Sequence, residues 1–375
     1  MELGIEGRPF ERTVLIIGAG AHCPYGFPSA AQLTEKIKPL GRAPRAPGEF
    51  GNSRTAHNYA CTPEMIAKRE ICVLLRHSGI LNFEEAMNED MIRTSCYRVV
   101  EDFVNGFAQS QVESIDVYLA KILALNPTDE LTASVGKLII AFFIRESERV
   151  TPVGFHRPDW IQFLIQNYLR HAEYLKVFLE SPPKIYTFNY DTHFERSFFS
   201  HLTSFHGYTN EDATKAVNGL KIKHIYGDVC SFNRPDKFLD TPEHYREAIR
   251  AIRVIGEERD KHDPELEPFG DDVESSDRTY FLGFSFDPLN VARLFSKVGH
   301  RTFRSDQFYC TRVGMTERQV DEIKGRIKIP LNFPSEKVDC LKLLSEEMPI
   351  FKLHIPEVLI TSSEDFSVDV PPHLR

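Results

Sequence analysis

The stretch VLIIGAGAHCPYGFPS, residues 14–29, decides the fold predicted for this chain. Its first four residues, Val14–Ile17, are apolar and predict a short buried strand. The turn Gly18-Ala19-Gly20 follows at once, and a helical pattern of apolar residues begins at Ala30. A parallel strand that runs through a glycine turn into a helix is a common way for an α/β sheet to meet a phosphate group.

The glycines of this turn allow two interpretations. Without side chains, Gly18 and Gly20 let the backbone turn sharply and let a ligand approach its N–H groups. The next glycine, Gly26, does not stand where the dinucleotide fingerprint requires one. The stretch therefore predicts a strand-turn-helix unit and leaves open whether the turn binds a ligand or is only a tight connection.

The composition predicts an ordinary globular protein. The chain has 375 residues, of which 42% are hydrophobic and 26% are charged, and its net charge is −9. A negative net charge argues against a surface dedicated to coating DNA or RNA. No apolar run approaches the ~20 residues that span a bilayer, and the N-terminal residues lack the pattern of a secretory signal. We therefore expect a cytoplasmic protein that contacts neither membranes nor nucleic acids.

The cysteines give no sign of a metal site. There are seven of them, scattered along the chain, and none forms a C-x-x-C pair. An odd number of widely spaced cysteines is typical of reduced intracellular thiols. The histidines form no H-E-x-x-H pattern. We therefore expect no bound metal.

Helix and strand patterns divide the chain. Residues 39–58 are rich in Pro, Gly, Arg and Ser and predict a mobile loop. The middle section is helical, with one-sided apolar stripes at Val135–Phe143 and Ile161–Leu169, and Trp160 opens a helix in a structural role. Strand patterns then return at Lys184–Phe188, Lys221–Tyr226, Ala251–Ile255, Tyr280–Phe284 and Gln307–Thr311.

These patterns predict an α/β protein. Strands that alternate with helices indicate a Rossmann-like, doubly wound parallel sheet, here with a large helical insertion between the first and second core strands. Residues 1–12 are then a leader, and residues 13–40 and 181–315 form the Rossmann-type domain. Residues 41–180 form the helical insertion subdomain, and residues 316–375 form a C-terminal extension.

The candidate chemistry lies where the later strands end. The three ends contain Thr187–Asp191, His224–Asp228 and Gly283–Asp287, and each combines hydrogen-bonding side chains with small residues. In an open α/β sheet, ligands bind at the carboxyl ends of the strands. We therefore expect these ends and the glycine turn to converge on one site.

These four stretches together resemble the sirtuin-like family of NAD-binding domains, and more closely its bacterial branch, which hydrolyses NAD in anti-phage defence. The family's G-A-G-x-S turn and following G-x-P correspond to Gly18–His22 and Gly26–Pro28. Its T-x-N-x-D motif corresponds to Thr187–Asp191, with Glu195 on the helix after it, and its final G-x-S stretch corresponds to Gly283–Asn290. The resemblance runs from about residue 13 to residue 315.

The resemblance implies an NAD+ site. As catalytic residues it implies Asn189 and Asp191, and as nucleotide-binding residues it implies Gly18, Ala19, Gly20, His22, Pro28, Thr187, Gly227, Gly283, Ser285 and Asn290. The chain departs from the family at two of its positions, because Tyr226 stands where sirtuins have a catalytic histidine and His22 stands where they have serine. The cysteine-rich zinc module of the protein-deacylating sirtuins is missing, which argues against a deacylase.

The chemistry of NAD+ hydrolysis gives roles to the two residues after the second strand. Nicotinamide leaves from a cationic form, so the protein has to position the ribose, stabilise developing charge and orient a water. The amide of Asn189 offers a donor and an acceptor to a ribose hydroxyl or to that water. Asp191 either orients the ribose or stabilises the cation, or it caps the following helix.

The remaining candidate residues are Tyr226 and four positions that each allow two interpretations. Tyr226 is a poor general base because the reference pKa of a phenol is ~10. His224, two residues earlier on the same strand face, either stands beside Tyr226 and supplies the missing imidazole or is a core histidine. His22 either contacts the pyrophosphate or faces solvent, and Ser285 with Asp287 either binds the adenosine side or caps a loop.

Three functions are compatible with these residues. The first is an NAD+ glycohydrolase that releases nicotinamide and ADP-ribose as a defence effector, held inactive in a homo-oligomer or by a regulatory partner protein. The second is a non-catalytic module that senses NAD, ADP-ribose or a related nucleotide, which the replacement of the usual histidine by Tyr226 favours. The third is a structural subunit that keeps the fold without the pocket.

Overall fold

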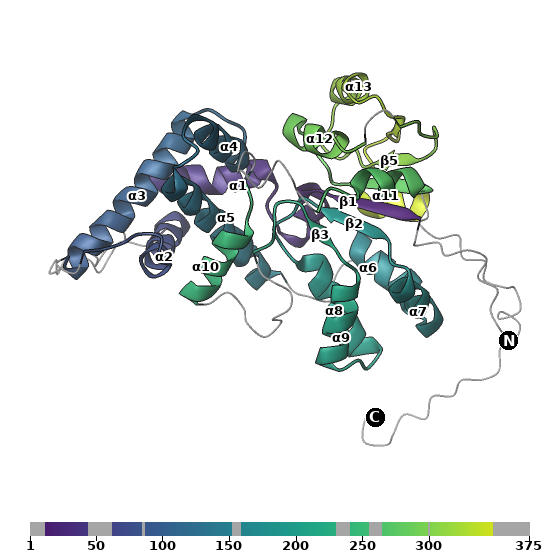
Figure 1. The fold of residues 1–375 in the computed structure, drawn as a ribbon, viewed down its shortest axis with the longest axis horizontal. Helices are drawn as coiled ribbons and strands as arrows, with labels where there is room; N and C mark the ends of the chain where they lie inside the picture. Colours follow the sequence, from purple (N-terminus) through teal and green to yellow (C-terminus); the bar gives the residue numbers. More distant parts are fainter. Residues whose placement is uncertain are drawn as a thin grey trace, which may run out of the picture.

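Six parallel strands form one sheet in the computed structural model, which describes residues 12–43, 62–84, 87–151, 159–229, 241–254, 265–298 and 301–347. Their order is β3-β2-β1-β4-β5-β6, so strands later in the chain lie on both sides of β1 (Figure 1). This is the order of a doubly wound Rossmann-type sheet, and the predicted fold class is confirmed. The strands are β1 (Thr13–Ile17), β2 (Lys184–Thr187), β3 (Lys223–His224), β4 (Arg278–Leu282), β5 (Phe308–Cys310) and β6 (Leu331–Asn332).

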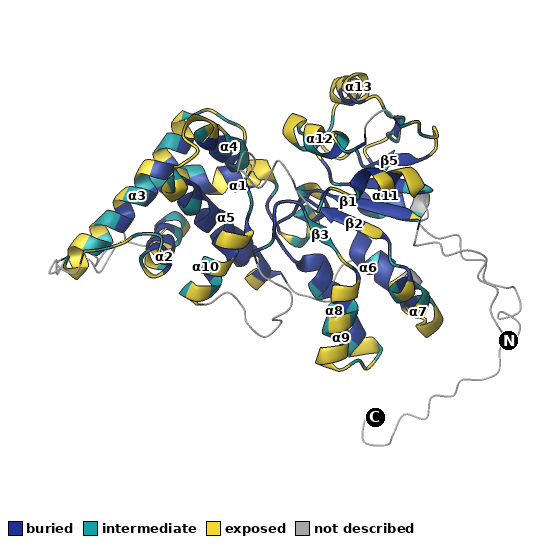
Figure 2. Cartoon of the chain, viewed as in Figure 1, coloured by how far each residue is buried: buried dark blue, intermediate teal, exposed yellow. Residues whose placement is uncertain are grey.

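Helices cover both faces of the sheet. In β1, Val14 and Ile16 belong to one buried cluster, and Leu15 and Ile17 belong to the other. All four are at most 2% exposed, as expected for a central parallel strand. Figure 2 shows the sheet as a buried centre between helices with exposed outer faces. The Leu15 side is covered by α6 (Trp160–Leu164), α7 (Ala172–Glu180), α8 (His193–Phe205), α9 (Asn210–Gly219) and α14 (Cys340–Lys342), and the Val14 side by α11 (Phe269–Ser275), α12 (Pro288–Phe295) and α13 (Glu317–Arg326).

The helical insertion packs beside the sheet as a bundle of its own (Figure 1). At its centre, α5 (Glu130–Val150) is buried along most of its length and contacts helices that precede and follow the insertion in the sequence. Its apolar stripe is the one predicted from the sequence. The helices around it are α1 (Ala30–Ile37), α2 (Pro63–His77), α3 (Glu89–Gln109), α4 (Ile115–Leu125) and α10 (Pro242–Ala251).

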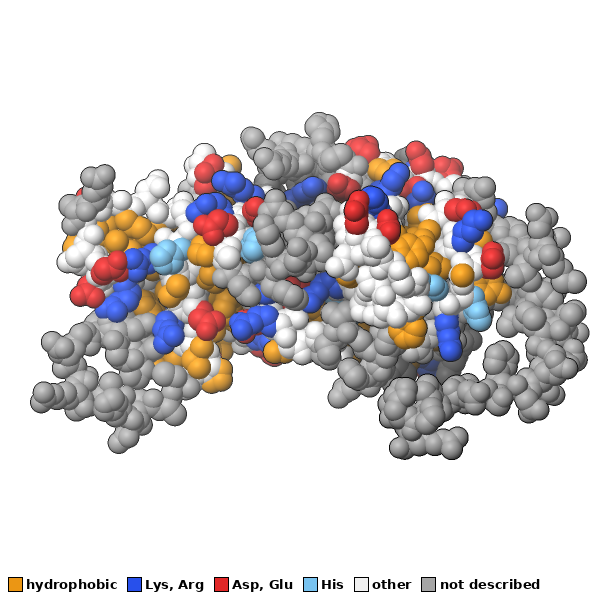
Figure 3. Space-filling view, turned by 90° about the horizontal axis from the view of Figure 1, so that it is seen from below, with side chains coloured by type: hydrophobic (Ala, Val, Ile, Leu, Met, Phe, Trp, Pro, Cys, Tyr) orange, Lys and Arg blue, Asp and Glu red, His pale blue; other side chains and the backbone are white. Residues whose placement is uncertain are grey.

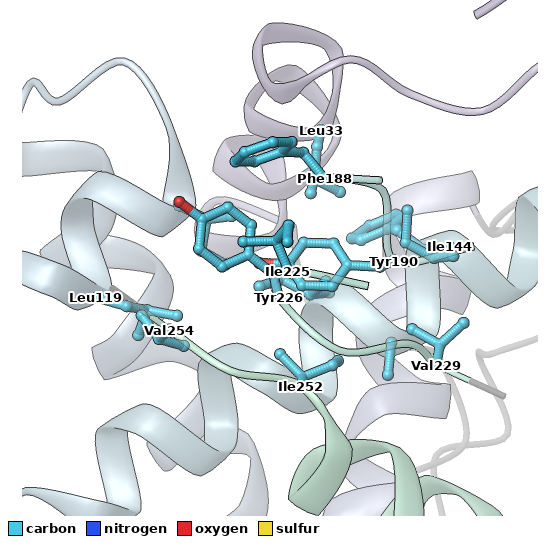
Figure 4. Close-up of a cluster of buried hydrophobic side chains, with 14 of the residues drawn as sticks. Leu33, Leu119, Ile144, Phe188, Tyr190, Ile225, Tyr226, Val229, Ile252 and Val254 are labelled. Atoms are coloured by element: carbon cyan, nitrogen blue, oxygen red, sulfur yellow. The ribbon is translucent and has the colours of Figure 1, made fainter. Parts of the chain in front are cut away.

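A shared apolar cluster joins the insertion to the carboxyl edge of the sheet. Phe188, Tyr190 and Tyr226, which follow β2 and β3, lie together with Ile252 and Val254 (Figure 4). The same cluster continues into side chains of α1, α4 and α5. The insertion therefore packs directly on the chain segments that carry the predicted site.

Two strand predictions differ from the structure. The prediction of a strand at Ala251–Ile255 is wrong over the described residues 251–254, because Ala251 ends α10 and the next three residues join no strand. Ile252 and Val254 are fully buried in the apolar cluster between the insertion and the sheet. Buried residues at these positions give the sequence the same apolar pattern as a strand. The strand predicted at Lys221–Tyr226 shrinks to Lys223–His224, whereas Leu331–Asn332 adds an edge strand that the sequence analysis missed.

The predicted domain boundaries cut through packed units at two places. Helices α6 and α7, counted with the insertion, pack against the sheet on the Leu15 side. Strand β6, counted with the C-terminal extension, pairs with β5. The leader up to residue 11, the loop residues 44–58 and the end of the extension from residue 348 lie outside the described residues.

The surface carries mixed charge. On the face shown in Figure 3, Lys and Arg side chains lie among Asp and Glu side chains. Across the described residues, no helix combines the length and apolar character that crossing a membrane requires. The free cysteines in this part of the chain are Cys23, Cys72, Cys96, Cys310 and Cys340.

Candidate functional site

The glycine turn after β1 packs backbone to backbone against the turn after β4. The N–H of Gly18 donates to the Leu282 carbonyl at 2.9 Å, and the N–H of Gly20 donates to the Gly283 carbonyl at 3.0 Å. A Cβ on Gly18 would lie 2.6 Å from the Gly283 oxygen. These glycines therefore permit the close approach of two chain segments. The N–H groups of Gly18 and Gly20 are already bonded within the chain, which favours the interpretation of this turn as a tight connection at these two residues.

Asn189 presents an unsatisfied amide immediately after β2. The residue is 4% exposed, and neither Oδ1 nor Nδ2 has a hydrogen-bond partner among the described residues. Its backbone is well held, because its N–H donates to Thr187 Oγ1 at 3.1 Å and its carbonyl accepts from His224 Nδ1 at 3.1 Å. Leaving a buried polar group unpaired costs about 1–3 kcal/mol. A fixed backbone with an unpaired amide is the arrangement of a ligand-binding side chain.

His224 is a charged support for Asn189. Its Nε2 donates to Glu195 on α8 at 2.6 Å, and its Nδ1 donates to the Asn189 carbonyl. Burial by itself would lower the pKa of His224, but the Glu195 carboxylate raises it to about 9. At neutral pH the ring is therefore an imidazolium with both nitrogens engaged. In this arrangement it cannot act as a general base.

The hydrogen bonds of His224 favour its interpretation as a core histidine over its pairing with Tyr226. Strand β3 ends at His224, and the chain turns through Gly227, whose φ is +70°. The Tyr226 hydroxyl donates to Asn290 on α12, and its ring packs against Phe188 with centroids 5.6 Å apart. The same-face argument needs a continuous strand, which these two positions do not share.

The Glu195–His224 pair is expected to stabilise the fold only below alkaline pH. Because the pKa of His224 rises from 6.5 to about 9 on folding, the stabilisation is fully present below pH 6.5 and is lost as pH rises through 9. Glu195→Gln should lower the free energy of unfolding by about 3 kcal/mol at pH 6.5 and by much less at pH 10.

Denaturant unfolding at the two pH values measures this difference. Glu211→Gln, which breaks an exposed pair with Lys215 on α9, is the control and should leave the unfolding midpoint unchanged. An equal loss for Glu195→Gln at both pH values would contradict the assignment of a charged His224.

Asp191 connects the second strand end to the glycine turn. Its Oδ1 accepts from His22 Nδ1 at 2.7 Å and from the His193 N–H at 3.0 Å, and its side chain is 3% exposed. Burial tends to raise the pKa of Asp191, but the adjacent His22 outweighs it, and the pKa lies below its ordinary value. Asp191 therefore accepts a hydrogen bond from a backbone N–H at the start of α8, as its capping interpretation predicts. Its role toward a ribose stays a prediction.

His22 and His193 lie in an aromatic group beside this contact. His22 is 2% exposed, so the alternative in which it faces solvent is wrong. The His193 ring lies 4.3 Å from that of Tyr25 and 5.3 Å from that of Phe27. Burial lowers the pKa of His193 to about 3, and neither ring nitrogen has a partner among the described residues. His193 is thus a neutral imidazole at physiological pH.

The other predicted residues lie around this edge of the sheet. Asp287 caps α12 by accepting from the Leu289 N–H at 2.9 Å, which supports its capping alternative. Ser285 is exposed, Pro28 is buried, and Thr187 holds the Asn189 backbone. Among the residues that the structure describes, no group of three His, Cys, Asp or Glu side chains is placed to hold a metal ion.

Glu148 and Asp116 also contact the candidate site, although no pattern in the sequence predicted a role there for either residue. Glu148, on α5, is 2% exposed, and its Oε1 accepts from the Thr192 N–H at 3.4 Å. Asp116, on α4, accepts from the Tyr190 hydroxyl at 2.5 Å. The only signal for Glu148 was an acidic residue close to an apolar helical stripe. The cap of α4 is Ser114, whose Oγ accepts from the Val117 N–H at 3.2 Å, so the Asp116 carboxylate is not needed as a cap.

A comparison with known protein families matches the central part of this chain to one family model. The family model described as a SIR2-like domain matches residues 183–311, which span β2 to β5 and contain Asn189, Asp191, Tyr226 and Asn290. This match supports the sirtuin-like resemblance, and SIR2-like domains bind NAD+. No curated protein and no solved structure gives a significant match to the chain.

Proposed function

We propose, from the SIR2-like match and from the geometry at the carboxyl edge of the sheet, that this protein hydrolyses NAD+ to nicotinamide and ADP-ribose. The observation that carries the proposal is the Asn189 amide, buried and without a partner among the described residues. It lies at the strand ends where Rossmann-type sheets bind nucleotides. An amide held in this way gains its missing hydrogen bonds when a ribose and a water enter the site.

Asn189, Asp191 and His224 have separate roles in this hydrolysis. The N-glycosidic bond breaks with its electron pair going to nicotinamide, a water oxygen bonds to the ribose carbon, and one proton is released. Asn189 holds a ribose hydroxyl or the attacking water, and the carboxylate of Asp191 stabilises the positive charge that develops on the sugar. His224, fixed by Glu195, keeps the Asn189 backbone in place.

We infer the biological role from the resemblance to the branch of the sirtuin-like family that hydrolyses NAD in anti-phage defence. An enzyme that depletes NAD+ would harm the cell that makes it unless it were controlled. We therefore propose a cytoplasmic effector of anti-phage defence that is held inactive as a homo-oligomer or by a regulatory partner protein. The structure contributes one feature to this proposal: the helical insertion packs against the site residues Tyr190 and Tyr226.

Release of nicotinamide tests the activity directly. Purified protein is incubated with NAD+, with and without extracts from phage-infected cells as the activator, and nicotinamide and ADP-ribose are measured by chromatography. We expect both products in equal amounts. If NAD+ stays intact under all these conditions, the hydrolase proposal fails.

A nucleotide-sensing module is the second candidate, and the bonding of Tyr226 and His224 favours it. Tyr226 occupies the usual histidine position and donates to Asn290, while His224 has both ring nitrogens engaged. No imidazole base is therefore available at the positions expected for one. Calorimetry with NAD+ that shows stoichiometric binding without release of nicotinamide would support this function and exclude the hydrolase.

A further inference from the structure

The helical insertion reaches the candidate site through two acidic side chains. Asp116 of α4 accepts a hydrogen bond from Tyr190, and Glu148 of α5 accepts one from the N–H of Thr192. Tyr190 and Thr192 are the two neighbours of Asp191 in the chain. The insertion thus contacts the segment from Asn189 to His193 on both sides of Asp191.

The end of α5 also holds the glycine turn after β1. Thr151, which follows α5, donates from its Oγ1 to the Tyr25 carbonyl at 2.7 Å. Tyr25 follows the turn that carries His22, the partner of Asp191. The last turn of α5 therefore contacts both segments whose side chains meet in the His22–Asp191 pair.

Glu148 lies in a buried group of charges. Its Oε2 lies 3.8 Å from a guanidinium nitrogen of Arg145 on α5 and 3.8 Å from one of Arg196 on α8. Arg145 is 2% exposed, as is Glu148 itself. Burying charges in this way often stabilises a protein less than apolar side chains of the same volume would. A contribution to stability therefore explains poorly why these charges are buried. Their position beside the candidate site explains it better.

We propose that Asp116 and Glu148 are positioning residues, through which the helical insertion holds the Asn189–His193 segment in the geometry required for NAD+ hydrolysis. This inference rests on the proposed function. It makes the insertion a part of the working site, because a shift of α4 or α5 would move the backbone next to Asp191. Displacements of reacting groups by about 1 Å can cost about 100-fold in rate.

The charge of Glu148 gives this role a pH dependence. The charged groups that face it are Arg145, Arg196 and Asp191, and His22 is hydrogen-bonded to Asp191. Burial raises the pKa of Glu148 to about 7, with Arg196 and Arg145 opposing the rise and Asp191 adding to it. The carboxylate form binds the arginines and the Thr192 N–H more strongly, so the kcat of the wild type should rise as pH passes through 7.

Charge-removing variants with a matched control test the proposal. Glu148→Gln and Asp116→Asn keep the shape and an acceptor oxygen, and Glu146→Gln breaks an exposed pair with Arg149 on the same helix. Glu148→Gln should lower kcat about tenfold with KM within about twofold, and its kcat should no longer rise through pH 7. Asp116→Asn should lower kcat in the same sense, and Glu146→Gln should match the wild type.

Hydrogen exchange in the protein without nucleotide separates this inference from the proposed function. Peptides that cover residues 189–196 should exchange about tenfold faster in Glu148→Gln and Asp116→Asn than in Glu146→Gln. Wild-type protein that never releases nicotinamide overturns the proposed function, whereas faster exchange would still support the contact between insertion and site. If both site variants match Glu146→Gln in exchange and in kcat, the positioning role is wrong.

Discussion

Asn189→Ala is expected to lower NAD+ hydrolysis about 100- to 1,000-fold while the unliganded protein stays at least as stable as the wild type. The loss of activity follows because the amide supplies hydrogen bonds to the reacting sugar or water. The stability is preserved because the buried amide has no partner among the described residues, so its removal also removes an unfavourable term of about 1–3 kcal/mol. Initial rates of nicotinamide release and thermal unfolding measure the two effects.

Asn332→Ala provides the matched control for this variant. The amide of Asn332, in β6, donates to the Ser305 carbonyl at 2.7 Å, away from the strand ends of the site. Its removal should lower stability slightly and leave the rate unchanged, which is the opposite pattern. A large drop in melting temperature for Asn189→Ala together with an unchanged rate of the folded protein would show that Asn189 is a structural residue.

Gly283→Ala is expected to destabilise the protein by at least about 3 kcal/mol, and to abolish folding if the native state cannot tolerate this loss. The φ of Gly283 is +57°, and a Cβ at this position would lie 1.9 Å from the backbone nitrogen of Ala21. Both turns would have to separate, which would break the hydrogen bond from Gly20 to Gly283. Denaturant unfolding measures the loss.

Gly207→Ala is the control that shows how much of the loss in Gly283→Ala comes from the positive φ and how much from the steric clash. The φ of Gly207 is +66°, but nothing lies within 4 Å of a Cβ added there. Its substitution should therefore cost only the left-handed conformation, about 1 kcal/mol. Equal losses for the two variants would contradict the close packing of the turns after β1 and β4.

The sheet could be predicted because its signals are local. Val14–Ile17 is an uninterrupted apolar run before a glycine turn, and the segments around Tyr186 and Phe281 are similarly apolar and end in polar residues. Buried parallel strands require this composition whatever surrounds them. Ile252 and Val254 have the same composition for another reason, since they fill the junction between sheet and insertion. Their burial was predictable, but the structure they adopt was not.

The contacts of the site depend on packing that the sequence does not reveal. That Asn189 follows a strand could be predicted, but that its amide stays unpaired is visible only when its neighbours are placed. The two ring nitrogens of His224 are hydrogen-bonded to the Asn189 carbonyl and to Glu195 on the next helix. His224 therefore holds the Asn189 backbone and does not supply the imidazole base that was one interpretation of the sequence. Glu148 lies far from Asp191 in the chain and meets this segment only because α5 packs against it.

A crystal structure of the protein with ADP-ribose and nicotinamide tests the central claim most directly. We expect the nucleotide to lie along the carboxyl ends of β1, β2 and β4, with the Asn189 amide within hydrogen-bond distance of the ribose or of a water next to its reactive carbon. Nucleotide bound elsewhere, with the Asn189 amide still unpaired, would contradict it.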